Sequence, residues 1–299
     1  MRRFALSSLT AIFVGACTPP PPASNTPEPA STEPSTAQGG EGEAADEASL
    51  PAAEEVLASA VQAVGGKDKL DAIESYYSES IMEVPAQKLK ATTKVWWQSG
   101  NFYSETDMPG VGVTKVWRNA EGTWSEDPIN GKREITGAEA RQMAWSNSLF
   151  LPADWQNYFS EAETVERRAP QDADAELIDV VLTSADGDEL KLSFDAQTGL
   201  MREQHFTQES PMGEMPVHIQ MEDYEEYGGF KTPTKQVMKM AVIEATTSVT
   251  KFEPNAQIDP SRFDPEAKGD KAGPSDMKAK GKNDEPGPSD MKSKPKKQG

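Results

Sequence analysis

The sequence predicts a mainly β fold, in which a strongly curved antiparallel sheet forms a half-barrel and is covered by helices. Apolar and polar residues alternate along short segments between residues 89 and 252, which is the period of a half-buried strand. Turn signals such as Ser99-Gly100 and Gly228-Gly229 separate many of these segments. The short connections require antiparallel neighbours, because parallel strands need long crossovers.

The first helix is expected to begin at Pro51 and to end at Gly65-Gly66, and a short second helix is expected at residues 67–73. Proline suits a first turn, and Glu54 and Glu55 lie at the positive end of the helix dipole. Apolar residues recur at helical spacing at Val56, Leu57, Ala60, Val61 and Val64. One face of this helix can therefore cover the inner face of the sheet.

A helical insert is expected within the series of strands, at residues 137–149. Thr136 lies at its cap position, and Glu139 lies at the capping-box position. The insert adds a second helical cover for the sheet. The strands are expected at residues 89–97, 101–106, 111–117, 177–183, 189–194, 200–208, 216–227, 230–240 and 246–252.

Trp96 and Trp97 are adjacent in the strand expected at residues 89–97, so they face opposite sides of the sheet. One side chain fits the core, and the other has to face solvent, a helix or a cavity. An interior aromatic and aliphatic cavity is how a curved sheet binds acyl chains, and a filled core is the alternative. The candidate ligand-binding residues are Val95, Trp96, Trp97, Trp117 and Met221.

The first 17 residues have the layout of a secretory signal. Arg2 and Arg3 give a positive start, an apolar stretch too short to span a bilayer follows, and small residues precede the only cysteine. Val14-Gly15-Ala16-Cys17 resembles the lipobox of bacterial lipoproteins, in which the chain is cut before a cysteine that is then acylated. We expect a signal peptide at residues 1–16 and a lipid anchor on Cys17. An ordinary signal with an unmodified cysteine is the alternative.

Two further segments have the composition of unpacked chain. Residues 17–50 are rich in Pro, Ser, Thr, Ala and Glu and contain no aromatic residue, so they cannot bury enough apolar area to offset ordering entropy. Residues 268–299 contain nine Lys against five Asp and Glu. We expect a tether and a solvated Lys-rich tail, with weak contact to anionic head groups or cell-wall polymer as an alternative for the tail. The folded domain then covers residues 51–267.

The charge and the motif inventory exclude several functions. The chain carries 30 Lys and Arg against 49 Asp and Glu, a net charge of −19, which repels phosphate backbones and excludes nucleic acid as an expected partner. One cysteine cannot build a disulfide framework. Nucleophile elbows, phosphate loops, dinucleotide motifs and zinc-peptidase motifs are absent from the sequence. We therefore expect neither an enzyme nor a cofactor.

Methionine and histidine residues cluster along the strands expected at residues 200–208 and 216–227. Thioether and imidazole ligands together suit Cu(I), which makes a copper chaperone an alternative function. In a hairpin of these strands, His205 and His218 lie opposite each other on the solvent face, and Met201 and Glu203 share the face of His205. The competing interpretations are exposed polar pairs with gap-filling Met, or Met residues around an adaptable apolar groove. The candidate ligands are Met201, His205, Met212, Met215 and His218.

Three stretches carry motifs that shape turns and strand ends. They are Ala63–Ser75, Met221–Pro233 with the pattern D-Y-x(4)-G-x(3)-P, and Val249–Phe263 with the pattern N-x(3)-D-x(3)-F. Together they resemble the superfamily of periplasmic carriers that sort outer-membrane lipoproteins, and its lipoprotein relatives. The resemblance implies an unclosed β-barrel lidded by helices, with an apolar concavity that holds acyl chains. The family's carrier is soluble, whereas this chain has an anchor signature, so it resembles an anchored receptor or lipid-binding lipoprotein more.

The sequence thus predicts a membrane-anchored periplasmic lipoprotein that binds a lipid or an acylated lipoprotein partner in an apolar concavity. Thr18 follows the anchor cysteine in place of the Asp that marks retention in the inner membrane, which favours the outer membrane. A structural or interaction module of the cell envelope with a filled core is the main alternative. The copper chaperone is the third.

Overall fold

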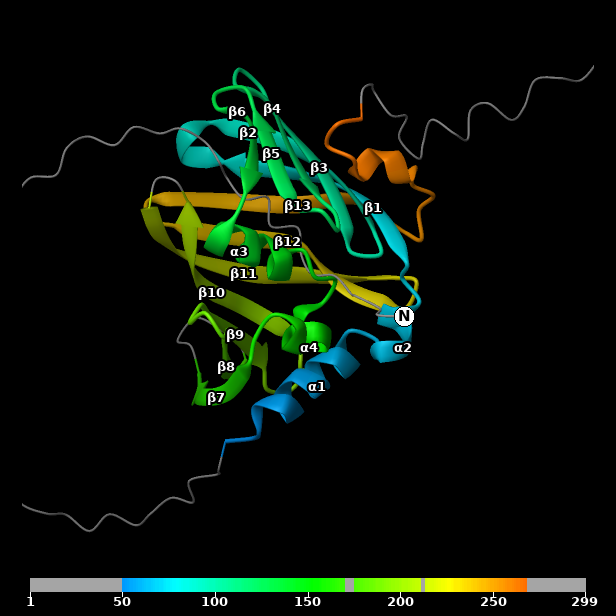
Figure 1. Cartoon of the computed structure of the whole chain (residues 1–299). Helices are drawn as coiled ribbons and strands as arrows, with labels where there is room; N and C mark the ends of the chain where they lie inside the picture. Colours follow the sequence, from blue (N-terminus) through cyan, green and yellow to red (C-terminus); the bar gives the residue numbers. More distant parts are fainter. Residues whose placement is uncertain (1–49, 170–174, 211–212, 268–299) are drawn as a thin grey trace, which may run out of the picture.

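The computed structural model describes residues 50–169, 175–210 and 213–267, and within them the chain forms one antiparallel sheet of 13 strands (Figure 1). The expected signal peptide, the anchor on Cys17, most of the tether and the Lys-rich tail lie outside these residues. None of the described helices combines the length and the apolar character that crossing a membrane requires.

The sheet is a meander that is joined at its middle. Its strand order is β6-β5-β4-β3-β2-β1-β13-β12-β11-β10-β9-β8-β7, so only β1 and β13 are neighbours without being consecutive. β6 and β7 form its two edges, and the barrel is not closed. The strands are β1 (Ser75–Val84), β2 (Leu89–Gln98), β3 (Asn101–Met108), β4 (Gly112–Arg118), β5 (Thr123–Asp127), β6 (Gly131–Ile135), β7 (Glu161–Arg168), β8 (Leu177–Thr183), β9 (Glu189–Asp195), β10 (Met201–Ser210), β11 (Gly213–Tyr227), β12 (Phe230–Met240) and β13 (Ile243–Pro254).

Within the described ranges, four α-helices lie on the concave side of the sheet or at its end, which confirms the predicted half-barrel covered by helices (Figure 1). They are α1 (Ala53–Ala63), α2 (Lys67–Asp71), α3 (Gly137–Ser146) and α4 (Leu151–Asp154). The insert expected at residues 137–149 ends earlier, at Ser146, and α4 follows as a separate turn of helix. The capping box is not formed, because the Thr136 side chain makes no cap hydrogen bond and Glu139 instead pairs with Arg133, with Nη1 to Oε2 at 2.9 Å.

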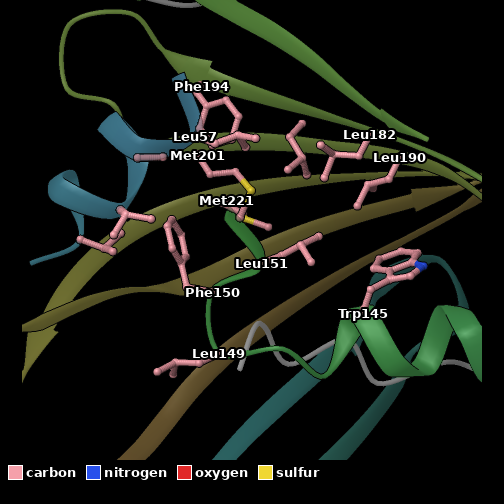
Figure 2. Close-up of a cluster of buried hydrophobic side chains, with 14 of the residues drawn as sticks. Leu57, Trp145, Leu149, Phe150, Leu151, Leu182, Leu190, Phe194, Met201 and Met221 are labelled. Carbon is pink, nitrogen blue, oxygen red and sulfur yellow. The ribbon is translucent and has the colours of Figure 1, made fainter. Parts of the chain in front are cut away.

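The concave face holds one continuous apolar core, which we call the inner core. The buried face of α1 and the side chains of α4 pack against the long strands β8–β11 (Figure 2). Leu57, Leu151, Phe194, Met201 and Met221 are each no more than 2% exposed. The space beneath α1 and α4 is therefore filled by side chains.

A second cluster lies on the convex face of β1–β4, and we call it the outer aromatic cluster. It consists of Tyr77, Trp96, Tyr103, Trp117 and Phe263. Residues 255–267, which we call the strap, cross over it and contribute Phe263 and Arg262. The Arg262 guanidinium lies 4.1 Å from the centre of the Trp96 ring. Trp96 and Trp97 thus face opposite sides, as expected, yet both are buried because the strap covers the outer one.

Three side chains of the N-x(3)-D-x(3)-F motif hold the strap in place. Asn255 Oδ1 accepts a hydrogen bond from the Glu74 backbone N–H at 2.8 Å, and Asn255 Nδ2 donates to the Ala72 carbonyl at 3.1 Å. Asp259 accepts from the Ser261 N–H at 2.9 Å and caps the 3₁₀ turn at Pro260–Phe263. The motif therefore fixes the strap at its start and its middle before Phe263 enters the outer aromatic cluster.

The other two motifs meet where α1 ends. Gly65 has φ +121°, and a Cβ built on it would lie 2.2 Å from the Gly229 carbonyl oxygen, so only glycine fits there. The Lys231 N–H donates to the Val64 carbonyl at 2.8 Å, and the Tyr224 hydroxyl donates to the Met201 carbonyl at 2.6 Å. The contacts of Val64 and Gly65 join the end of α1 to the β11–β12 hairpin, and the Tyr224 hydrogen bond joins β11 to β10.

Candidate binding cavity

A cavity of about 570 Å³ lies beside the inner core, between α3 and the ends of several strands. Its aromatic walls come from Trp97 at the end of β2, Trp145 of α3 and Tyr158 after the turn at Trp155–Asn157. Its polar rim comes from the β2–β3, β4–β5 and β8–β9 connections. The cavity is thus built from segments that are far apart in the sequence.

An ion pair holds α3 against the β8–β9 turn at the rim of the cavity. Arg141 Nε lies 2.7 Å from Asp188 Oδ2, and Arg141 Nη2 lies 3.1 Å from Asp188 Oδ1. Asp186 adds a longer contact of 3.4 Å. The hydrogen bonds from Arg141 lower the pKa of the Asp188 carboxyl, so the pair stays ionised in mild acid.

Arg118 at the end of β4 gives the rim a second guanidinium. It is half-buried and forms no ion pair with any described residue. Tyr158 lines the same cavity. Burial raises the pKa of its hydroxyl, and the negative charge of Asp154 acts in the same direction, so the hydroxyl stays protonated at neutral pH. The cavity combines flat apolar walls with a cation at its rim, which suits an amphiphile with an acceptor group.

The sequence-derived binding candidates divide among three places. Trp97 lines the cavity. Val95 and Met221 are buried in the inner core, and Trp96 and Trp117 lie on the opposite face in the outer aromatic cluster. These four residues do not line this cavity, because the core side chains and the strap cover them.

Three residues that shape the cavity were not among the candidates: Arg118, Trp145 and Tyr158. Trp145 is 5% exposed and packs edge-on against Phe206 with ring centres 5.1 Å apart. Its indole N–H has no hydrogen-bond partner in the part of the chain that the structure describes. A tryptophan on a helix inserted between strands can be recognised in the sequence as a candidate cavity residue. The position of Arg118 and Tyr158 on one cavity depends on the curvature of the sheet, which the strand pattern does not give.

The histidine pair forms as expected. His205 of β10 lies opposite His218 of β11, and their rings stack at 4.0 Å with planes 10° apart. Glu203 lies beside them, and the hydrogen bond from His205, together with Arg168, lowers its pKa to about 2. Burial lowers the pKa of His218, and the adjacent His205 acts in the same direction.

Among the described residues, the methionine and histidine candidates of the alternative copper site do not lie together. A β-bulge in the pairing of β10 with β9 inserts Arg202 between Met201 and Glu203 and turns Met201 into the inner core. Met215 lies within β11 opposite Gln208 and packs on the inner core. Met212 lies outside the described residues. Met201 and Met215 therefore lie on the opposite face of the sheet from His205 and His218.

Fold and cavity together define a helix-lidded antiparallel half-barrel with a lateral pocket. No protein-family model matches the sequence, and no curated protein matches it.

Solved structures do match. A DUF1329 family protein from Desulfovibrio piger is 14% identical over 71% of this chain and 96% of its own, with a TM-score of 0.49. A LolA superfamily protein from Nitrosomonas europaea is 12% identical over 71% of this chain and 97% of its own, with a TM-score of 0.49. An outer membrane lipoprotein-sorting protein domain from Vibrio parahaemolyticus is 10% identical over 71% and 96%, with a TM-score of 0.46. Each of these is a likeness of fold alone.

Proposed function

We propose that this protein is a non-enzymatic lipid-binding protein of the bacterial cell envelope, and that it holds a lipid or the acyl group of a lipoprotein partner in the lateral cavity. The cavity itself is the observation that carries the proposal. Its volume of about 570 Å³ falls within the roughly 300–1,000 Å³ of ligand pockets. Trp97, Trp145 and Tyr158 supply apolar walls, and Arg118 supplies a partner for a head group.

Cavity filling tests this function. A fluorescent fatty acyl probe titrated into the delipidated full chain is expected to bind with quenching of tryptophan emission. Ala144→Trp places an indole in the cavity wall and is expected to abolish binding. The matched control is Ala140→Trp on the same helix at a position that does not line the cavity, and it is expected to bind as wild type does. Equal binding by both variants, or no binding by wild type, contradicts the proposal.

We place the protein on the outer membrane, facing the periplasm, through acylation of Cys17. The lipobox-like sequence and the small residues before the cysteine support this placement. Cys17→Ser is expected to move the protein from the membrane fraction to the soluble fraction, with its thermal stability unchanged. A Cys17→Ser variant that still pellets with membranes contradicts the anchor and leaves the cavity proposal standing.

A structural or interaction module of the envelope is the second candidate, and the filled inner core favours it. The space beneath α1 and α4 is occupied by Leu57, Leu151 and Met221, so no ligand enters there without rearrangement. This alternative gains support if Ala144→Trp leaves the function of the protein in cells unchanged while acyl probes fail to bind.

A further inference from the structure

Three donor side chains converge on the convex face of the sheet, away from the cavity. Glu203 and His205 are two residues apart on β10, so they share a face, and His218 lies opposite His205 on β11. The bulge that turns Met201 inward also sets Glu203 on this outer face. One ligand atom from each of Glu203, His205 and His218 lies within 4.8 Å of the other two.

We propose that Glu203, His205 and His218 form a binding site for a divalent transition-metal ion of the Zn²⁺ or Cu²⁺ type. Glu203 Oε2 lies 3.1 Å from His205 Nε2 and 3.6 Å from His218 Nε2. The buried His218 Nε2 has no hydrogen-bond partner among the described residues. A buried nitrogen without a partner is costly, and a metal ion would satisfy it.

The surroundings hold the carboxylate in place. Arg168 Nη2 donates to Glu203 Oε2 at 2.8 Å and to Ser193 Oγ at 3.1 Å, while Arg168 Nε donates to Asp179 at 2.9 Å. Asp179 is fully buried and also accepts from Lys191 at 3.1 Å. Carboxylates that bind metals are commonly fixed by such outer hydrogen bonds. Arg168 therefore acts as a positioning residue for Glu203.

The donor set selects the class of ion. Two imidazoles and one carboxylate suit Zn²⁺ and Cu²⁺, whereas Ca²⁺ and Mg²⁺ prefer oxygen ligands and Cu(I) prefers thiolate or thioether. Three protein ligands leave a coordination position for water or for a group from a partner.

Two features limit the affinity. The imidazole rings stack in parallel, so each has to turn about its Cβ–Cγ bond before both Nε2 atoms point at one ion. Lys239 lies opposite His218 in the register, and Lys191 lies opposite His205. Both cations repel a metal ion at close range. Removing the charge of Lys239 is therefore expected to tighten binding.

Calorimetric titration of the full chain with ZnCl₂ and CuCl₂ tests the site. The titrated protein is prepared without an affinity tag, and all variants are made in a Cys17→Ser background so that no thiol competes for the metal ion. One ion per chain is expected, with Cu²⁺ bound more tightly than Zn²⁺. Electron paramagnetic resonance of the Cu²⁺ complex is expected to show coupling to two imidazole nitrogens.

Three variants each remove one ligand: His205→Gln, His218→Gln and Glu203→Gln. Each is expected to weaken binding at least tenfold, and Lys239→Met is expected to strengthen it. Glu222→Gln, on the same strand as His218 but paired with Lys235, is the matched control and is expected to bind as the background does. Far-UV circular dichroism without metal verifies that each variant is folded. No saturable binding, or equal binding by folded ligand variants and the control, overturns the proposal.

Discussion

The two halves of the sheet place their large side chains differently. Strands β8–β11 carry aliphatic and aromatic residues on the concave face, and charged groups such as Asp179 and Glu203 face outward. Strands β1–β5 also bury Tyr76, Trp97 and Phe102 on the concave face, but they place a second set of aromatic rings on the convex face. Much of their remaining concave face carries small hydroxyl residues, at Ser78, Ser80, Thr93, Ser104 and Ser125.

The difference follows from what covers each half. Helices α1 and α4 cover the concave face of the second half, so large side chains are buried there. The strap covers the convex face of the first half, so aromatic rings are buried outside the barrel. The cavity lies where α3 spans toward the ends of β2 and β4, because neither half supplies side chains that fill this space.

The largest expected effect is in the inner core of the second half. Phe194→Ala removes a ring that is 1% exposed and leaves a cavity, so it is expected to lower the free energy of unfolding by about 3–5 kcal/mol. Urea unfolding followed by circular dichroism measures this change.

The first half supplies the contrast for Phe194→Ala. The Ser78 hydroxyl is fully buried on the concave face without a hydrogen-bond partner among the described residues. Ser78→Ala removes no satisfied hydrogen bond and is expected to change the free energy of unfolding by less than about 1 kcal/mol. Similar losses in both variants would show that the two halves are packed alike.

A smaller effect is expected at the strap. Arg262→Met removes the guanidinium that stacks on Trp96 at 4.1 Å and on Tyr103 at 5.7 Å, and it is expected to cost about 1–2 kcal/mol. Partial release of the strap is also expected to raise the accessibility of Trp96 to acrylamide quenching. Unchanged quenching together with unchanged stability would mean that Phe263 and Asn255 hold the strap without Arg262.

The smallest effect concerns acid stability at the rim of the cavity. The pKa of Asp188 is lowered in the folded protein, so its pairing with Arg141 stabilises the fold above the ordinary pKa of aspartate and is lost as pH falls through the lowered value. Asp188→Asn removes this contribution, which is expected to be below about 1 kcal/mol because the pair is partly exposed. Thermal unfolding from pH 7 to pH 3 is therefore expected to show a smaller acid loss in the variant. An identical pH profile would rule out a stabilising pair.

The sequence predicts the strands that have one buried and one exposed face. The segments expected at residues 177–183 and 230–240 match β8 and β12 at both ends, since their alternation is regular. The strand pattern missed β1, β5, β6 and β7. The last two are sheet edges, where a strand such as Glu161–Arg168 buries too little to show an apolar period.

The candidate site was less predictable, for two physical reasons. Alternation assumes an unbroken strand, and the single extra residue at Arg202 reverses the face of Met201. Burial of a side chain also depends on segments far along the chain. Trp96 is covered by Arg262 and Phe263, and the cavity of Trp97 is completed by α3 and the β8–β9 turn. Local sequence patterns do not indicate which distant segments pack against a given residue.

The pairing of β1 with β13 has a consequence for how the chain acquires its structure. β1 at the middle of the sheet pairs with β13, the last strand, about 170 residues later, so the join between the two meanders can form only once Ile243–Pro254 is present. Until then each meander presents a long open strand edge, which is the surface that mispairs between molecules. A polypeptide that ends before residue 243 therefore lacks the β1–β13 pairing that joins the two half-sheets. The expected consequence is aggregation rather than the loss of one binding residue.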